Sequence, residues 1–296
     1  MLFTLIFLLL GTFIFSYSSV YASLKLSHTL GAIDVPNGRK EHSIPTARTG
    51  GLAFFVAFFV FLMLSPVGTE LKISLLPLCT AVFLVGLFDD ACGLSPIRKL
   101  TGQISGAAIY VFFSGFESPL VGAFTLLWIV FLSNAINLTD GLNGLAGGIS
   151  ATQSLCLACV SVLLNNREVM ICSLLLFASI VGFLPSNFPR ARIFMGDCGA
   201  LFLGATLGAL SSRLVIEDGG ILGVISVLLI FRIPIADTLQ SFFRRTLRGK
   251  NPFAADRGHF HHRLVDIGFT RECATLALVS ISLFFGLLGI VVSLIK

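Results

Sequence analysis

Residues 75–90 read LLPLCTAVFLVGLFDD, an apolar run of helical length that ends in two adjacent carboxylates, Asp89 and Asp90. No charged residue interrupts residues 75–88, which is typical of a helix inside a membrane. Two ionisable groups at the end of such a run are costly near a bilayer and are usually retained for function. The stretch therefore predicts a membrane helix that carries an acidic pair to the membrane surface. The plainer alternative is a half-solvated pair that ends one helix or caps the next.

The rest of the chain has the same apolar character. Hydrophobic residues make up 55% of its 296 residues and charged residues 12%, which excludes a soluble domain with an ordinary surface. The sequence predicts an all-α, polytopic integral membrane protein, with residues 1–296 forming a single transmembrane domain. The first apolar run lacks the features of a cleaved signal peptide, and we expect it to remain as a helix. About ten helices of roughly 15 to 23 residues are expected near residues 2–21, 50–66, 71–88, 102–116, 119–134, 144–164, 169–187, 199–216, 220–243 and 273–295.

Lys and Arg are distributed unevenly between the loops on the two sides of this predicted bundle. Fifteen of them fall in the loops on one side and four on the other. Because basic loops face the cytoplasm, both termini are expected on the opposite, outer side. The functional face of the molecule is therefore expected to be cytoplasmic, as long loops usually carry function. The cytoplasmic loops are expected at about 22–49, 89–101, 134–143, 188–198 and 244–272.

Three further polar clusters interrupt the apolar sequence on that side: NAINLTDGLNGLAGG at 134–148, FMGDCG at 194–199 and DRGHFHHR at 256–263. Carboxylate and amide oxygens suit a hard cation such as Mg²⁺ far better than zinc. The histidines lie beside arginines and lack a Cys pair or an HExxH helix, which favours binding of an anion. Simpler roles are a helix cap for Asp197, a tight turn at 134–148, and headgroup anchoring by the basic loop.

Acidic metal ligands and a basic, histidine-bearing loop on one membrane face predict chemistry on a phosphate or diphosphate, with Mg²⁺ offsetting the anionic charge. One substrate is expected to be lipid-borne, because a soluble phosphate ester would not require catalysis from inside a membrane bundle. A polyprenyl phosphate places its headgroup at this depth.

These clusters resemble the motifs of the polyprenyl-phosphate N-acetylhexosamine-1-phosphate transferases. The resemblance covers nearly the whole chain and implies transfer of N-acetylhexosamine 1-phosphate from a UDP-sugar to undecaprenyl phosphate, with release of UMP. It also implies a requirement for Mg²⁺, with Mn²⁺ as a substitute. The matching segments are Asp34–His42, Gly50–Gly51, Gly86–Asp90 with Lys99, Asn134–Gly148, Phe194–Gly204, Pro234–Asp237 and Pro252–Gly268.

The resemblance implies a role for each matching residue. Asp197 and Asn137 correspond to the metal site, and Asp89 and Asp90 to the catalytic pair that handles the lipid phosphate. Phe194 corresponds to an aromatic residue that stacks on uracil. The other substrate-binding residues implied are Lys40, Lys99, Asn134, Asp140, Asn143, His259, His261, His262 and Arg263.

Two details refine this expectation. Many bacterial members have DGxDG where this chain has Asp140-Gly-Leu-Asn143-Gly144, which puts in doubt any contact that needs a carboxylate at 143.

The pattern HFHHRL at 259–264 resembles the branch that initiates O-antigen, enterobacterial common antigen and teichoic acid chains. We therefore expect UDP-GlcNAc or a related UDP-HexNAc as donor, in cell-wall or lipopolysaccharide biosynthesis at the bacterial inner membrane. Membrane lipids are expected partners and nucleic acid is not; a homodimer is left open.

A different class of function is a transporter or flippase for an anionic or lipid-linked solute. Arg232 and Asp237 flank Pro234 inside an apolar run and suggest a pathway in a broken helix. The plainer interpretation is a mutually compensating charge pair beside a kink. A transporter is expected to show related halves and charges near the bilayer midplane, and the sequence shows neither.

Overall fold

The computed structural model describes residues 2–35, 45–247, 249 and 258–295. Helices make up almost all of this part of the chain, and a short antiparallel hairpin pairs Ile33 with Ala47 and Asp34 with Thr46. The elements are α1 (Leu2–Leu30), β1 (Ile33–Asp34), β2 (Thr46–Ala47), α2 (Gly51–Leu64), α3 (Thr69–Cys92), α4 (Pro96–Ser114), α5 (Pro119–Thr139), α6 (Leu145–Leu163), α7 (Arg167–Asn187), α8 (Gly196–Leu214), the π-helical turn η1 (Val215–Gly219), α9 (Gly220–Ile230), α10 (Arg232–Leu247), α11 (Phe260–Asp266) and α12 (Arg271–Ser293).

The predicted all-α membrane fold is confirmed, and each expected apolar run corresponds to a helix except 220–243, which is divided between α9 and α10. Among the described residues, seven helices are long and apolar enough to cross a membrane, or eight if the pair α9 and α10 forms one bent span. The expected number of about ten is therefore approximate, since α2 and α4 fall outside this group. The bend between α9 and α10 is 73°. Pro234 lies in the first turn of α10, where its missing N–H disrupts no helical hydrogen bond.

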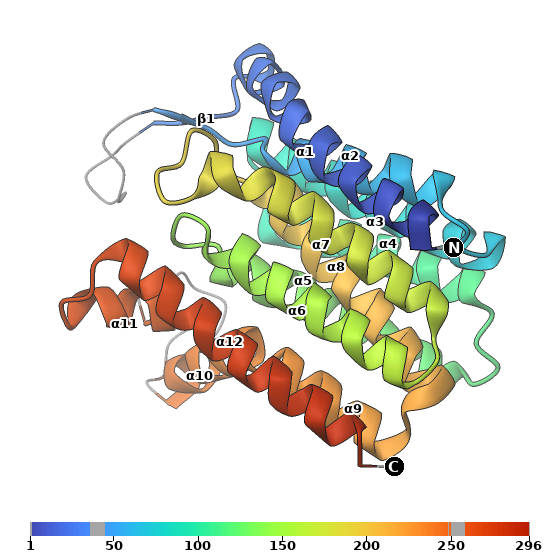
Figure 1. Ribbon diagram of the computed structural model, residues 1–296. Helices are drawn as coiled ribbons and strands as arrows, with labels where there is room; N and C mark the ends of the chain where they lie inside the picture. Colours follow the sequence, from blue (N-terminus) through green and yellow to red (C-terminus); the bar gives the residue numbers. More distant parts are fainter. Residues whose placement is uncertain (1, 36–44, 248, 250–257, 296) are drawn as a thin grey trace.

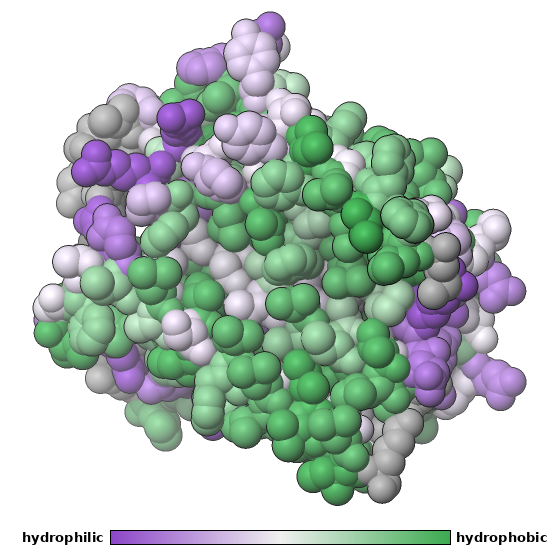
Figure 2. All heavy atoms as spheres, in the orientation of Figure 1, coloured by the Kyte–Doolittle hydropathy of each residue, from purple (hydrophilic) through white to green (hydrophobic). Residues whose placement is uncertain are grey.

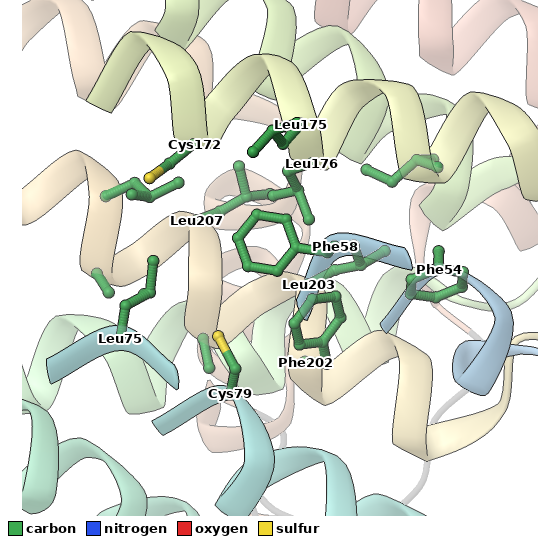
Figure 3. Close-up of a cluster of buried hydrophobic side chains, with 14 of the residues drawn as sticks. Phe54, Phe58, Leu75, Cys79, Cys172, Leu175, Leu176, Phe202, Leu203 and Leu207 are labelled. Carbon is green, nitrogen blue, oxygen red and sulfur yellow. The ribbon is translucent and has the colours of Figure 1, made fainter. Parts of the chain in front are cut away.

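The central element of the bundle is α8, which packs against α3 and α5 and also contacts α2, α6 and α7. Small residues allow this close packing, because a Cβ added at Gly204 would collide with the α5 backbone at Leu132 and Ser133. Figure 3 shows the aromatic and aliphatic side chains that fill the space around α8. The labelled residues are Phe54, Phe58, Leu75, Cys79, Cys172, Leu175, Leu176, Phe202, Leu203 and Leu207.

The outer surface is apolar in a band between two polar ends. Figure 2 shows this band as a green region with purple, hydrophilic residues gathered at opposite sides of the molecule. Large exposed side chains such as Phe3, Phe7, Phe124 and Phe284 contribute to this apolar surface. Apolar exposure of this extent, on helices that satisfy their own backbone hydrogen bonds, is what contact with lipid requires.

The loops that carry the polar clusters lie together at one end of the bundle. In Figure 1 the β1–β2 hairpin, the α5–α6 loop, the α7–α8 loop and α11 lie at the left, and both chain ends lie at the right. The end with the loops is called the site end below, and the opposite one the far end. The clustering expected from the sequence is thus found in the structure.

Candidate active site

Asp90 connects α3 to the beginning of α8. The helix α3 continues to Cys92, so the acidic pair lies in its last turn. The Asp90 side chain is 0% exposed, and its two oxygens accept hydrogen bonds from the backbone N–H groups of Asp197 (3.0 Å) and Cys198 (2.9 Å). These are N–H groups that the first turn of a helix leaves without an internal partner, so Asp90 caps α8 from another helix. Arg48 Nη2 lies 3.4 Å from Asp90 Oδ1.

Three glycines make this junction possible. Gly196 has φ +70°, and a Cβ there would collide with the Arg48 carbonyl oxygen and the Asp90 carboxylate. A Cβ at Gly86 would meet the backbone of Cys198, and one at Gly51 would meet the backbone of Gly199. Only residues without a Cβ allow α2, α3 and the start of α8 to approach this closely.

Asp89 points to a second, less buried cluster. Lys99 Nζ donates to Asp89 Oδ2 at 2.9 Å and also to Asp197 Oδ2. Asn137 Nδ2 donates to Asp197 Oδ1 at 2.9 Å. The side chains of Asp89, Lys99 and Asp197 are 14%, 18% and 18% exposed, so they can be reached from the site end. Four separate helices, α3, α4, α5 and α8, thus bring two carboxylates, an ammonium and an amide together.

The oxygen donors of this cluster are of the type that Mg²⁺ binds. Among the described residues no three His, Cys, Asp or Glu side chains surround a common point, so a closed protein cage is not found there. Magnesium does not need one, because it usually binds one or two carboxylates and takes its other ligands from water and substrate phosphates. The hard oxygen donors come from Asp197, Asn137 and the neighbouring Asp89. A positive charge already lies between the two carboxylates, because Lys99 Nζ donates to both of them.

Asp140 lies in the α5–α6 loop next to this cluster. Its burial, together with the negative charges of Asp197 and Asp90, raises the pKa of Asp140 to about 7. Asn134, six residues earlier on α5, exchanges hydrogen bonds with the amide of Gln103, with its Nδ2 2.5 Å from Gln103 Oε1. Asp140 is thus poised to change charge near neutral pH, whereas Asn134 is held within the bundle.

Asn143 ties the α5–α6 loop to the α7–α8 loop. Its Nδ2 donates to the carbonyl oxygen of Pro189 at 3.2 Å, and the next residue, Gly144, donates its N–H to Asn187 Oδ1 at 2.8 Å. An ionised aspartate at 143 could accept hydrogen bonds but not donate one to this carbonyl. The asparagine that departs from the common DGxDG pattern therefore has a specific contact here.

The histidine segment lies against the same loop. His261 is buried, and a Cβ added at Gly141 would collide with its ring. Burial and the neighbouring His262 lower the pKa of His261 to about 4, so this ring is neutral at physiological pH. His259 is also buried, with Nδ1 2.7 Å from Asp237 Oδ2. Arg263 is exposed on α11.

Phe194 leads into α8 from the hairpin side. Its N–H donates to the Ala47 carbonyl oxygen at 2.8 Å, and its own carbonyl accepts from Gly50 N at 2.9 Å. The side chain is half-buried, whereas the following Met195 is 1% exposed and belongs to the main core. The predicted substrate-binding residue Lys40 lies outside the described residues.

Two features of the site were not predicted from the sequence. The sequence assigns no site role to Arg48, although it directly precedes Thr49 and the Gly50–Gly51 pair of a matching motif. The suggested pairing of Arg232 with Asp237 is not what the structure shows: Asp237 contacts His259, and Arg232 lies over the ring of Phe285 at 5.5 Å. No sequence signal marked the contact between Asp237 and His259, because 22 residues separate them.

The sequence of the chain is similar to those of known proteins. Residues 72–215 match the model of the family described as glycosyl transferase family 4. The chain is 32% identical over 283 residues to a probable undecaprenyl-phosphate N-acetylglucosaminyl 1-phosphate transferase of Bacillus subtilis, a match that covers 90% of this chain and 79% of the relative.

Two further relatives show a similar degree of likeness. An undecaprenyl-phosphate alpha-N-acetylglucosaminyl 1-phosphate transferase of Thermotoga maritima is 33% identical over 267 residues, covering 87% of this chain and 81% of the relative. A decaprenyl-phosphate N-acetylglucosaminephosphotransferase of Mycobacterium tuberculosis is 31% identical, covering 85% and 73%. The chain therefore belongs to glycosyl transferase family 4, among the polyprenyl-phosphate N-acetylhexosamine-1-phosphate transferases.

Proposed function

We propose that this protein transfers N-acetylglucosamine 1-phosphate, or a closely related N-acetylhexosamine 1-phosphate, from its UDP-sugar to undecaprenyl phosphate. An oxygen of the lipid phosphate forms a bond to the β-phosphorus, the bond from that phosphorus to the α-phosphate oxygen breaks, and UMP leaves. The products are undecaprenyl-diphosphate-N-acetylhexosamine and UMP. The observation that carries the proposal is the cluster of Asp89, Lys99, Asn137 and Asp197 at one end of a membrane bundle whose relatives are named for this acceptor class.

The positive charges of the site are suited to hold the phosphates. Lys99 already lies between two carboxylates, and an incoming phosphate can replace one of them as its partner. Arg48 is 35% exposed while its guanidinium faces Asp90, so it can contact a second phosphate without leaving the site end. Both side chains would lower the electrostatic cost of bringing two anionic substrates together.

Asp197 and Asn137 are the residues that would hold Mg²⁺, with Mn²⁺ as its substitute. When bound, this ion offsets phosphate charge and aligns the two substrates. Asp89 lies beside the same cluster and is placed to orient the lipid phosphate. A lipid phosphate is already an anionic nucleophile, so we favour direct attack over an aspartyl intermediate.

Phe194 is proposed to stack on uracil, because it lies half-buried at the start of α8 close to Asp197. The site end is proposed to face the cytoplasm of a bacterial cell, where UDP-sugars are made, with both termini outside. Family membership and the gathering of the loops that carry the polar motifs at one end favour a transferase over a transporter or flippase.

The donor is identified by a panel assay. Purified protein with undecaprenyl phosphate and Mg²⁺ is offered UDP-GlcNAc, UDP-GalNAc and UDP-glucose, and UMP is measured. We expect UMP release with a UDP-N-acetylhexosamine donor and little with UDP-glucose.

Phe194→Ala is expected to weaken UDP binding by about 1–3 kcal/mol, whereas Phe194→Tyr keeps the ring and the affinity. Unchanged UDP affinity in Phe194→Ala would place the nucleotide elsewhere.

A further inference from the structure

One face of α10 holds the segment that leads into α11. Asp237, Ser241 and Arg244 follow one another at spacings of four and three residues, which places them on the same side of the helix. Asp237 Oδ1 accepts from the backbone N–H of Phe260 at 2.8 Å, and Arg244 Nη1 donates to the Gly258 carbonyl oxygen at 2.7 Å. Three consecutive residues, 258–260, are therefore fixed to α10.

The contact between Asp237 and His259 is the most buried part of this arrangement. Asp237 is 3% exposed and His259 is 5% exposed. A carboxylate oxygen only accepts hydrogen bonds, so its 2.7 Å distance to His259 Nδ1 requires the proton to be on Nδ1. The Ser241 hydroxyl lies 3.3 Å from the same ring nitrogen. Nε2 is then the ring nitrogen that remains for another partner.

The ring of His259 lies against His261, which contacts the α5–α6 loop. It is stacked parallel to His261, with ring centroids 5.9 Å apart and an angle of 6° between the planes. His261 in turn lies against Gly141, the residue that follows Asp140. His259 is therefore connected through His261 to the loop that carries Asp140.

We propose that Asp237 is a positioning residue of the transfer reaction, which fixes the orientation of the His259 ring so that Nε2 faces a phosphate oxygen of the bound substrates. This inference rests on the proposed function. A carboxylate that accepts from Nδ1 fixes the orientation of an imidazole ring and leaves Nε2 directed at the ring's other partner. Asp237 lies on α10, the second helix of the bent α9–α10 pair. The contact between Asp237 and His259 therefore also connects this bent pair to the segment that leads into α11.

A double-mutant comparison tests this role. Asp237→Asn, His259→Gln and the double variant are assayed for UMP release, with kcat and KM determined for both substrates. We expect Asp237→Asn to lower kcat about 10- to 100-fold with little change in either KM. The double variant should be no slower than His259→Gln alone, because Asp237 acts through His259. Asp237→Glu, which keeps the carboxylate, should recover part of the loss.

Thr238→Val is the matched control. Thr238 is the neighbour of Asp237 on α10, and its buried hydroxyl has no hydrogen-bond partner in the part of the chain that the structure describes. This variant should keep the wild-type kcat. The unfolding midpoint of every variant in detergent is measured alongside.

The inference is overturned if Asp237→Asn keeps the wild-type kcat, or if the two single losses multiply in the double variant. It is also overturned if Asp237→Asn only lowers the unfolding midpoint and Asp237→Glu recovers stability without recovering kcat, since the role would then be structural. A wild-type protein that releases no UMP would instead refute the proposed function, so the two failures are distinguishable.

Discussion

At the scale of single residues, the two adjacent aspartates have different surroundings and should have different roles. Asp90 is fully buried as the cap of α8, whereas Asp89 contacts Lys99 in the accessible cluster. We expect Asp90→Ala to lower the free energy of unfolding by about 1–3 kcal/mol, because two N–H groups of α8 lose their acceptor. Asp89→Ala should lower kcat about 10²-fold with a smaller effect on stability. Unfolding curves and kinetics for both variants decide this, and equal stability losses would contradict it.

Asp140 should make stability depend on pH. Its folded-state pKa of about 7 lies above the value of roughly 3.9 expected in the unfolded chain. Between these values the folded protein holds a proton that the unfolded chain has released, so this group's contribution to stability is lost as pH rises towards 7. The side chain of Asp140→Asn does not titrate. The unfolding midpoint of this variant minus that of wild type should therefore be larger at pH 8 than at pH 5.

The comparison is made in detergent without divalent cations. Asp266→Asn, on the exposed surface of α11, serves as the control and should show the same difference from wild type at both pH values. The neutral His261, whose pKa is lowered to about 4, titrates in both proteins and cancels in the comparison. A difference between Asp140→Asn and wild type that does not change with pH would show that Asp140 is ionised throughout.

At the scale of elements, the approach of α3 to α8 determines the geometry of the site. Gly86→Ala places a methyl group against the backbone of Cys198, and overpacking of this kind costs about 1–3 kcal/mol. The variant should lose stability and, because Asp90 and Asp197 move apart, most of its activity. Gly223→Ala is the control, since a Cβ there meets nothing within 4 Å. Thermal unfolding and UMP release are measured for both, and normal activity in Gly86→Ala would refute the close junction.

The elements also show what the sequence could predict. Apolar runs such as 75–88 indicate helices, because a segment in contact with lipid or core must be apolar and must satisfy its own backbone hydrogen bonds. The acidic pair indicated which end of the bundle carries the function. The residues at which the helices end were harder to predict from the sequence. α1 continues to Leu30 through a polar stretch, and α3 includes the two aspartates. Short-range patterns also carry no information about which side chains meet across the bundle. The contacts of Arg48 with Asp90 and of Asp237 with His259 join distant segments, and only the folded structure reveals them.

At the scale of the whole molecule, the proposed orientation can be measured with the native cysteines. Cys92, in the last turn of α3 beside Asp89, and Cys273, in the first turn of α12 that follows α11, are both exposed. If the site end faces the cytoplasm, a membrane-impermeant maleimide should leave both unlabelled in intact cells and label them in inverted vesicles. Glu117→Cys, in the exposed α4–α5 connection at the far end, should show the opposite behaviour. Labelling of Cys92 and Cys273 from outside would reverse the orientation.

The proposed function is the transfer of a sugar phosphate onto a lipid phosphate at the cluster around Asp197. Its most direct test is the simultaneous measurement of UMP and lipid-linked sugar from UDP-GlcNAc, undecaprenyl phosphate and Mg²⁺ by purified protein. In wild type and in the far-end control Glu117→Gln, one UMP should be released for each lipid-linked sugar formed. Neither product should appear unless both substrates are present. Asp197→Asn should be slower by about 10²-fold or more while remaining folded. UMP release without the lipid phosphate, or a near wild-type rate in Asp197→Asn, would contradict this proposal.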